Sequence, residues 1–319
     1  MATPNLSEII TTTLRNRSGK LADNVSKGNP LLMKLKEKGA WKSASGRTIV
    51  QELDYAENAT FMYYSGSETL NIGASDVITA AEFDWKQAAV AVQASGLEID
   101  VQNTGKEAVI DLLEARIKNA ERTMKNNITS GLYSDGTGTG GKQIGGLQLL
   151  VADDPTTGTV GGINRATYSF WRNKIADASV ESITVSATTI QSLFNVLYLR
   201  TTRGADHTDL IMADSVYYQY FLGSMQAIQR VADSKMAEAG FQSVKYMGAD
   251  VCYEDSTGMP ASHAYFLNTD YLHFRYAPNR LFKPLERVNS INQDAVVQLI
   301  TFAGNLTTSN ASLQGVAHA

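Results

Sequence analysis

Residues 48–85 limit what this chain can fold into more than any other stretch, because they form two long limbs without a core of their own. The stretch RTIVQELDY runs outward, SGSETLNIGASD supplies turn residues, and the returning limb alternates at Ala81, Phe83 and Trp85. We therefore predict an extended β-arm rather than a domain. At ~3.3 Å per residue, an arm folded double between Gln51 and Trp85 reaches on the order of 50 Å. Its unpaired edges invite contact with another chain.

The arm and the segment before it carry opposite charges. Residues 1–47 contain nine Lys or Arg against three Asp or Glu, whereas residues 48–85 contain seven Asp or Glu and neither Lys nor Arg. Segments of opposite sign attract each other, either within one chain or between neighbouring copies. Two solvated faces are the alternative interpretation, because runs of like charge usually just face water.

The composition is that of an ordinary soluble protein, with 43% apolar and 19% charged residues over 319 positions. This length allows one large domain or two to three small ones. The single cysteine, Cys252, excludes an internal disulfide framework. No apolar run approaches the length of a membrane span, so no membrane partner is predicted.

A long helix is predicted from Thr104 to Leu132. Thr104 and Glu107 have the spacing of a capping box. Apolar residues then recur at helical spacing on one face, at Leu113, Ile117, Ala120, Met124 and Ile128. From position 165 onward, helical patterns within 186–204 and 215–226 alternate with strand patterns, and the last long strand pattern covers 292–310. The fold class is therefore α+β.

The stretch GTGTGGKQ, residues 136–143, contains the glycine and lysine spacing of phosphate-binding loops. Such loops follow a strand and open a helix, so that the phosphate meets a helix N-terminus. Here the long helix ends before the loop, and QIGGLQLLV after it has a strand pattern. Gln143 also stands where a Ser or Thr would hold magnesium. We interpret the loop as a hinge. A nucleotide-binding enzyme that uses residues 136–142 stays as the weakest alternative.

No catalytic, cofactor-binding or metal-binding residues are predicted. The four histidines lack the paired spacing of zinc ligands, and no G-x-S-x-G nucleophile motif is present. A lone His on a strand, such as His273, is more often structural than a ligand. Cys252 lies between Val251 and Tyr253 in a predicted strand, where it packs as a small hydrophobe.

Several stretches resemble the Hong Kong 97-type major capsid proteins of tailed phages. They are VIDLLEARIKNAERTMKNNITSGLYSDG, GGKQIGGLQLLV with GGINRATYSFWRN, and LIMADSVYYQYF. Their order along nearly the whole chain carries the resemblance. It implies an N-arm, an extended β-hairpin called the E-loop, a peripheral domain with a long spine helix, and an inserted axial domain. The expected boundaries are 1–47 for the N-arm, 48–90 for the E-loop, 91–164 with 277–319 for the peripheral domain, and 165–276 for the axial domain.

The resemblance implies a structural protein without enzymatic activity. It would assemble with itself, as hexamers and pentamers, into an icosahedral shell around phage double-stranded DNA, which it would touch without sequence specificity. The expected location is the virion capsid, assembled in the cytoplasm of a bacterial host. Portal, scaffolding and cement proteins are expected as partners. An encapsulin-like shell with protein cargo is an alternative that the residues leave open.

Two sets of residues are predicted to make the contacts between subunits. The E-loop set is Glu52, Asp54, Glu57, Phe61, Tyr63, Tyr64 and Glu68. The basic N-arm set is Arg15, Arg17, Lys20, Lys27 and Arg47. One branch of the resembled family links its subunits covalently through a lysine on the E-loop. Since residues 48–85 contain no lysine, and Lys86 lies at the base of the returning limb, a non-covalent shell is expected.

Overall fold

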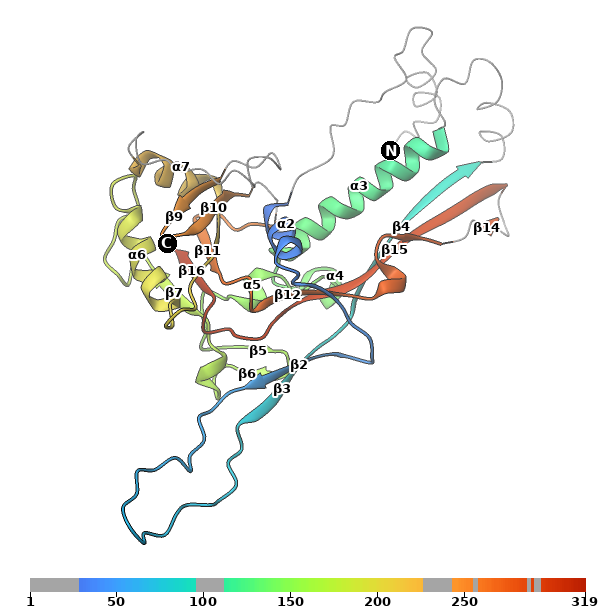
Figure 1. Cartoon of the computed structure of the whole chain (residues 1–319). Coiled ribbons are helices and arrows are strands. Elements are labelled where there is room, and N and C mark those ends of the chain that lie inside the picture. The colour runs from blue at the N-terminus through green and yellow to red at the C-terminus, as the bar shows by residue number, and fades with distance from the viewer. Residues whose placement is uncertain (1–28, 96–111, 226–242, 255–257, 286–287, 290–293) are drawn as a thin grey trace.

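Strand β15 (Ala295–Thr308) runs through the middle of the first of two six-stranded sheets. The computed structural model describes residues 29–95, 112–225, 243–254, 258–285, 288–289 and 294–319 (Figure 1). Along one edge, β15 pairs antiparallel with β4 (Lys86–Ser95) from Ala295 to Gly304. Its other neighbours are β12 (Leu272–Tyr276), β13 (Lys283–Pro284) and β14 (Val288–Asn289), and β12 pairs in turn with β1 (Trp41–Ser43).

The second sheet forms a separate lobe. Its strand order is β7 (Lys174–Asp177), β16 (Gly315–His318), β11 (His263–Leu267), β8 (Leu210–Ala213), β10 (Ala249–Tyr253) and β9 (Ser243–Tyr246). The helices α6 (Ile190–Thr201) and α7 (Ser215–Ser224) bury one face against this sheet. Asp214 caps α7, because its carboxylate accepts the amide of Tyr217 at 2.9 Å.

Helix α3 (Leu112–Leu132) lies beside β4 and β15 on the first sheet (Figure 1). The predicted apolar stripe is confirmed where side chains are described: Ala120, Met124 and Ile128 are buried in the core. The expected capping box at Thr104 and Glu107 lies outside the described residues. Among the described residues, no helix is long and apolar enough to cross a membrane.

The glycine-rich stretch after α3 folds back on the end of that helix. The Ser134 hydroxyl lies within hydrogen-bond distance of two carbonyls, that of Gly131 at 2.8 Å and that of Ile144 at 2.9 Å. A Cβ on Gly146 would lie 2.4 Å from the Leu132 carbonyl oxygen, so only glycine allows this closure. The predicted strand at QIGGLQLLV is wrong, because residues 143–146 make this tight return and the chain then forms the short helix α5 (Leu147–Leu150). The loop before the return contains α4 (Gly138–Gly141), in which Thr139 and Gly140 have left-handed φ and ψ.

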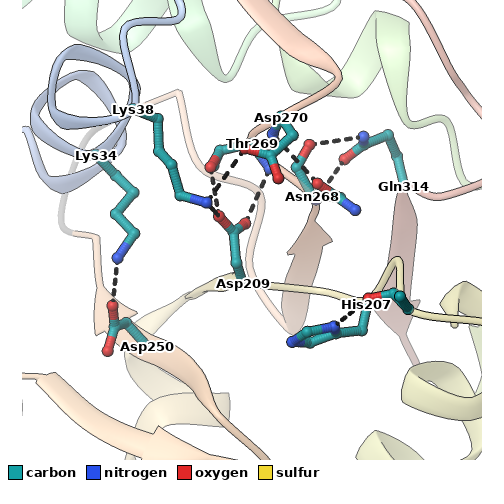
Figure 2. A network of polar contacts seen from close by, with 10 residues as sticks. Lys34, Lys38, His207, Asp209, Asp250, Asn268, Thr269, Asp270 and Gln314 are labelled. Atoms are coloured by element: carbon teal, nitrogen blue, oxygen red, sulfur yellow. Dashed lines mark hydrogen bonds and ion pairs between the residues drawn. The ribbon is translucent and has the colours of Figure 1, made fainter.

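Helix α2 (Pro30–Glu37) joins the two lobes. Its Asn29 cap accepts the amide of Leu32 at 2.9 Å, and Leu31 and Leu35 are fully buried in the core. Lys34 on α2 and Lys38, the C-cap residue of this helix, then reach the second lobe (Figure 2). Lys34 donates to the buried carboxylate of Asp250 at 2.6 Å.

Lys38, at the C-cap of α2, is more exposed and lies between two acids (Figure 2). It is 3.2 Å from a carboxylate oxygen of Asp270 and 3.3 Å from one of Asp209. Asp209 also accepts the amide of Thr269 at 2.9 Å, which fixes the turn between β11 and β12. Hydrogen bonds and ion pairs therefore hold α2 to the second lobe, in addition to apolar burial.

The remaining strands and short helices are attached to the first lobe. They are β2 (Ile49–Asp54) with β3 (Ile78–Phe83), β5 (Thr159–Val160) with β6 (Ile163–Asn164), and the 3-10 turns η2 (Ser169–Trp171) and η4 (Pro278–Arg280). The larger core cluster contains side chains from α2, α3, β2, β3, β12 and β15. Cys252 is buried in the same cluster, as expected of a small hydrophobe.

Strand pairing crosses the expected domain boundaries in three places. Strand β12 was expected within the axial domain but pairs with β1 and β15 of the first sheet. Strand β16 was expected within the peripheral domain but pairs with β7 and β11 of the second sheet. Strand β4 begins inside the expected E-loop yet pairs with β15. The division into four parts stays a prediction, and the two sheets do not follow its boundaries at these three strands.

His273 on β12 couples stability to pH. Its side chain is 7% exposed, and its Nδ1 atom has no hydrogen-bond partner in the described part of the chain. Burial, with the charges of Lys42 and Arg275 nearby, lowers the pKa of His273 to about 4. The ring is therefore neutral in the folded protein, whereas it takes up a proton near pH 6.5 in the unfolded chain.

We predict that His273 destabilises the fold as the pH falls below about 6.5, because only the unfolded chain then binds the proton. By linkage this loss reaches about 2 kcal/mol near pH 5 and stops growing below the folded pKa. Denaturant unfolding of His273→Phe should depend less on pH over this range. The exposed His207, changed to Ala, is the matched control. Parallel pH profiles for wild type and His273→Phe would contradict the prediction.

Candidate assembly interface

The arm leaves the body as a ribbon with two unlike faces. Strands β2 and β3 pair antiparallel from Ile49↔Phe83 to Asp54↔Ile78, so alternate residues share a face. Ile49, Leu53 and Phe83 are buried in the core on one face. Val50 and Ile78 are exposed on the other face together with the acids of both strands. This alternation fixes the register of the ribbon, because a slip by one residue would expose the buried set.

A small hairpin supports the buried face of the ribbon. Strands β5 and β6 are joined by Gly161 and Gly162, both at positive φ, as a two-residue turn requires. The carbonyl of Gly161 accepts the amide of Glu82 at 2.9 Å. The Trp171 indole donates to the carbonyl of Val160 at 2.9 Å and fills the space below. The base of the arm is therefore held in one orientation relative to the body.

Beyond this base, residues 55–77 extend away from the body without regular strands (Figure 1). The expected hairpin is thus paired only near its base. Large apolar side chains are exposed along the extension, among them Phe61 at 76%, Tyr63 at 89% and Ile72 at 92%. Phe61 and Tyr63 contact each other edge to face, with ring centroids 5.2 Å apart. A single chain gains nothing by exposing this apolar surface, which is typical of a contact site.

All seven predicted E-loop contact residues are exposed on the arm. Glu52, Asp54 and Glu57 line one side of a groove of about 710 Å³, opposite Arg203 and Tyr271 of the body. Phe61, Tyr63, Tyr64 and Glu68 lie farther out. The structure therefore divides the predicted set into an acidic group at the base and an aromatic group toward the tip.

Only one of the five predicted basic contact residues belongs to the described part of the chain. Arg15, Arg17, Lys20 and Lys27 lie outside the described residues, and Arg47 is exposed just before β2. Two further cations of the basic segment, Lys34 and Lys38, form ion pairs within the subunit. The positive charge available to a neighbouring copy is therefore smaller than the sequence balance indicates.

The glycine loop has the wrong electrostatics for a phosphate. It closes on the C-terminal end of α3, where carbonyl groups point outward and the helix dipole is negative. Lys86, at the foot of the arm, donates to the carbonyl of Gly141 at 2.6 Å. Its amino group is therefore directed to this turn. The loop joins the arm, α3 and β15, since Gly145 also donates its amide to Asn305 at 3.1 Å.

The histidines do not gather into a catalytic or metal site. In the described part of the chain, no group of three or more His, Cys, Asp or Glu side chains could hold a metal ion. His263 is paired with Asp153 at 3.1 Å and stacks on His318 across the β11–β16 pair. Burial opposes the charged ring, but the hydrogen bonds to Asp153 and to the Ala261 carbonyl outweigh it and raise the pKa of His263. This contact fastens the loop after α5 to the second lobe.

Sequence reasoning missed the aromatic residues that surround the arm base. Tyr55 at the end of β2 packs on Phe170 with ring centroids 5.2 Å apart, and Phe170 contacts Tyr168 at 6.0 Å. The only signal was local, since Gly161 and Gly162 between apolar residues are typical of a tight hairpin turn. No sequence pattern connects that hairpin with a strand 80 positions earlier, because only the tertiary structure brings them together.

No protein-family model matches this chain, and no curated protein matches it. Solved structures do. The capsid asymmetric unit of cyanophage A-1(L) superposes with a TM-score of 0.70 at 18% identity, covering 96% of each chain. The capsid of a native GTA particle superposes with a TM-score of 0.59 at 11% identity, covering 96% of this chain and 95% of that one.

A protein shell of another kind has the same fold. The SrpI encapsulin complex from Synechococcus elongatus superposes with a TM-score of 0.54 at 10% identity, covering 100% of this chain and 96% of that one. At these identities the likeness establishes the fold, over nearly the full length of both chains. The Hong Kong 97-type fold predicted from the sequence is confirmed.

We predict that Gly161→Ala loosens the base of the arm. A Cβ there would lie 2.9 Å from the Ala81 Cβ and 3.0 Å from the Phe83 ring, at a φ of +58°. The hairpin must then move away from β3, at a cost of about 1–3 kcal/mol. Hydrogen exchange of the Glu82 amide should accelerate. In the control Gly162→Ala, nothing lies within 4 Å of the added Cβ, so only backbone strain remains. Equal exchange in both variants would contradict the proposed support.

Proposed function

We propose that this chain, which has the Hong Kong 97-type fold, is the major capsid protein of a tailed phage. In this proposal many copies assemble into an icosahedral shell around double-stranded DNA. The observation that carries the proposal is the arm, which is rigidly held at its base and exposes apolar side chains along an extension that its own subunit does not cover. The full-length likeness to capsid subunits supports the same conclusion.

The arm suits a head-to-tail contact between copies. An arm that projects from one side of a subunit contacts a different surface on the next subunit, so the interface is heterologous. Repetition of such a contact closes into rings when the rotation fits, and rings of five and six are the units of an icosahedral shell. We propose that Phe61, Tyr63 and Tyr64 contribute apolar burial to this contact, while Glu68 remains at its polar rim.

The acidic base of the arm has a separate role in this proposal. Glu52, Asp54 and Glu57 would face the basic N-arm of a neighbouring copy, where Arg15, Arg17, Lys20, Lys27 and Arg47 are found. Each exposed pair contributes only about 0.2–1 kcal/mol, but a shell repeats the contact in every subunit. Basic N-arm residues that face inward would contact DNA phosphates instead.

The rest of the proposal follows from the shell. The protein would belong to the virion capsid, would assemble in the bacterial cytoplasm, and would work with portal, scaffolding and cement proteins. The shell would be non-covalent, because the arm has no lysine and the amino group of Lys86 is bound to Gly141. An encapsulin-like shell is the second candidate, favoured by the likeness to the SrpI complex. The nature of the cargo distinguishes the two.

We predict that the purified protein, with its assembly partners supplied, forms closed or open shells in electron micrographs. The double variant Phe61→Ser with Tyr63→Ser should remain folded, because both rings are exposed in the subunit. It should fail to form shells, because the apolar contact is lost. The matched control is Leu199→Ser, an exposed apolar residue on α6. Wild-type protein that stays monomeric at high concentration would contradict the shell, and normal shells from the double variant would contradict the role of the rings.

We predict that the triple reversal Glu52→Lys, Asp54→Lys and Glu57→Lys impairs assembly without unfolding the subunit, since all three side chains are exposed. Assembly of wild-type protein should also weaken as salt rises, because exposed charges are screened within about 10 Å at 0.1 M. Light scattering at low and high salt measures both effects. The reversal of Asp294 to Lys, an exposed acid just before β15 and away from the arm, is the control. Normal assembly of the triple variant at low salt would exclude the proposed pairing.

A further inference from the structure

A second hollow lies at the base of the arm, on the side of the β5–β6 hairpin. It measures about 320 Å³ and is lined by Tyr55, Asp76 and Ile78 of the arm and by Tyr168 and Phe170 of the body. The three aromatic rings form a continuous series, with centroids 5.2 Å apart between Tyr55 and Phe170 and 6.0 Å apart between Phe170 and Tyr168. This aromatic pocket is small, at the lower limit of ordinary ligand sites.

The charges around the aromatic pocket favour a cation. Aromatic faces carry a negative quadrupole and attract ammonium and guanidinium groups within about 6 Å of the ring centroid. Asp76 adds a carboxylate at the rim, and none of the described residues that line the pocket is a lysine or arginine. Aromatic rings with one acid on an anionic arm would repel a phosphate or a carboxylate.

The position of the pocket allows one bound side chain to contact the arm and the body at the same time. It bridges the arm and the β5–β6 hairpin, so a bound side chain touches both and holds them together. Tyr168 is about half exposed, which leaves its ring accessible from outside. Tyr55 also lines the acidic groove with Glu52, Asp54 and Glu57, so the two hollows share this residue. A basic segment that crosses the arm base therefore meets carboxylates and aromatic faces in succession.

We propose that the aromatic pocket binds an arginine or lysine side chain from residues 12–28 of a neighbouring copy. This stretch contains Arg15, Arg17, Lys20 and Lys27 against the single acid Asp23. The described chain begins at α2, which lies on the opposite side of β12 and β15 from the arm (Figure 1), so a neighbouring copy is the better-placed source. The inference rests on the proposed shell and specifies a contact within it.

Peptide binding to full-length subunits, released from particles, tests the pocket. The probe is a fluorescent peptide of residues 12–28, together with a neutral peptide of the same length, in which citrulline replaces Arg15 and Arg17 and acetyl-lysine replaces Lys20 and Lys27, so that no cationic side chain remains. A cation–π contact is worth about 2- to 30-fold in affinity. The cationic peptide should therefore bind Tyr168→Leu more weakly than wild type by a factor in that range. Tyr168→Phe, which keeps the ring, should bind like wild type.

The neutral peptide completes the comparison. It should bind wild type more weakly than the cationic peptide does, and it should not distinguish wild type from Tyr168→Leu. Equal affinity of wild type and Tyr168→Leu for the cationic peptide, or no binding to wild type at all, would overturn the pocket. Electron micrographs of the same preparations distinguish a failure of the pocket proposal from a failure of the proposed function. Shells without peptide discrimination would refute the pocket alone, whereas wild-type protein that never forms shells would refute the function.

Discussion

The backbone pairing of β15 is the constraint on which the rest of the first lobe depends. Its 14 residues hold β4 along one edge and β12, β13 and β14 along the other. This one ladder positions β4 at the foot of the arm, β12 after the second lobe, and the chain that follows β15. Asn305 extends this control, because its side chain contacts both Gly145 after α3 and the carbonyl of Asp84 below the arm. The arm, the long helix and the glycine joint thus meet at one strand.

Local patterns predicted the elements that depend on local physics. The β-arm, the apolar stripe of α3 and the long last strand all follow from periodicity within a few residues. The strand predicted at QIGGLQLLV failed because the close approach of Gly146 to the Leu132 carbonyl reverses the chain there. That contact depends on the position of Gly146 beside Leu132 in the folded chain, and the spacing of apolar residues does not predict it.

The exposure of the predicted contact residues followed from the sequence, but the architecture around them did not. A segment with acids and aromatics but without a core predicted which side chains would be exposed, and their role as contacts stays a prediction. The groove beside Glu52 needs Arg203 and Tyr271, and the aromatic pocket needs Tyr168 and Phe170, which come from distant parts of the chain. Strands β12 and β16 also lie in a different sheet from the one that their expected domains predicted, and the reason is the same. Pairing partners at large sequence separation are chosen by the fold as a whole, so no local pattern contains them.

If the chain assembles as proposed, the single sign of charge on the arm has a consequence for free subunits. Exposed rings such as Phe61 and Tyr63 would stick to the same rings on another free subunit, giving a symmetric dead-end dimer. Every arm, however, carries seven acids and no cation, so two arms that approach each other repel. This repulsion is absent when an arm contacts a surface that is neutral or positively charged. The negative charge of the arm would therefore prevent contacts between two arms, while it would allow contact between an arm and a surface without negative charge.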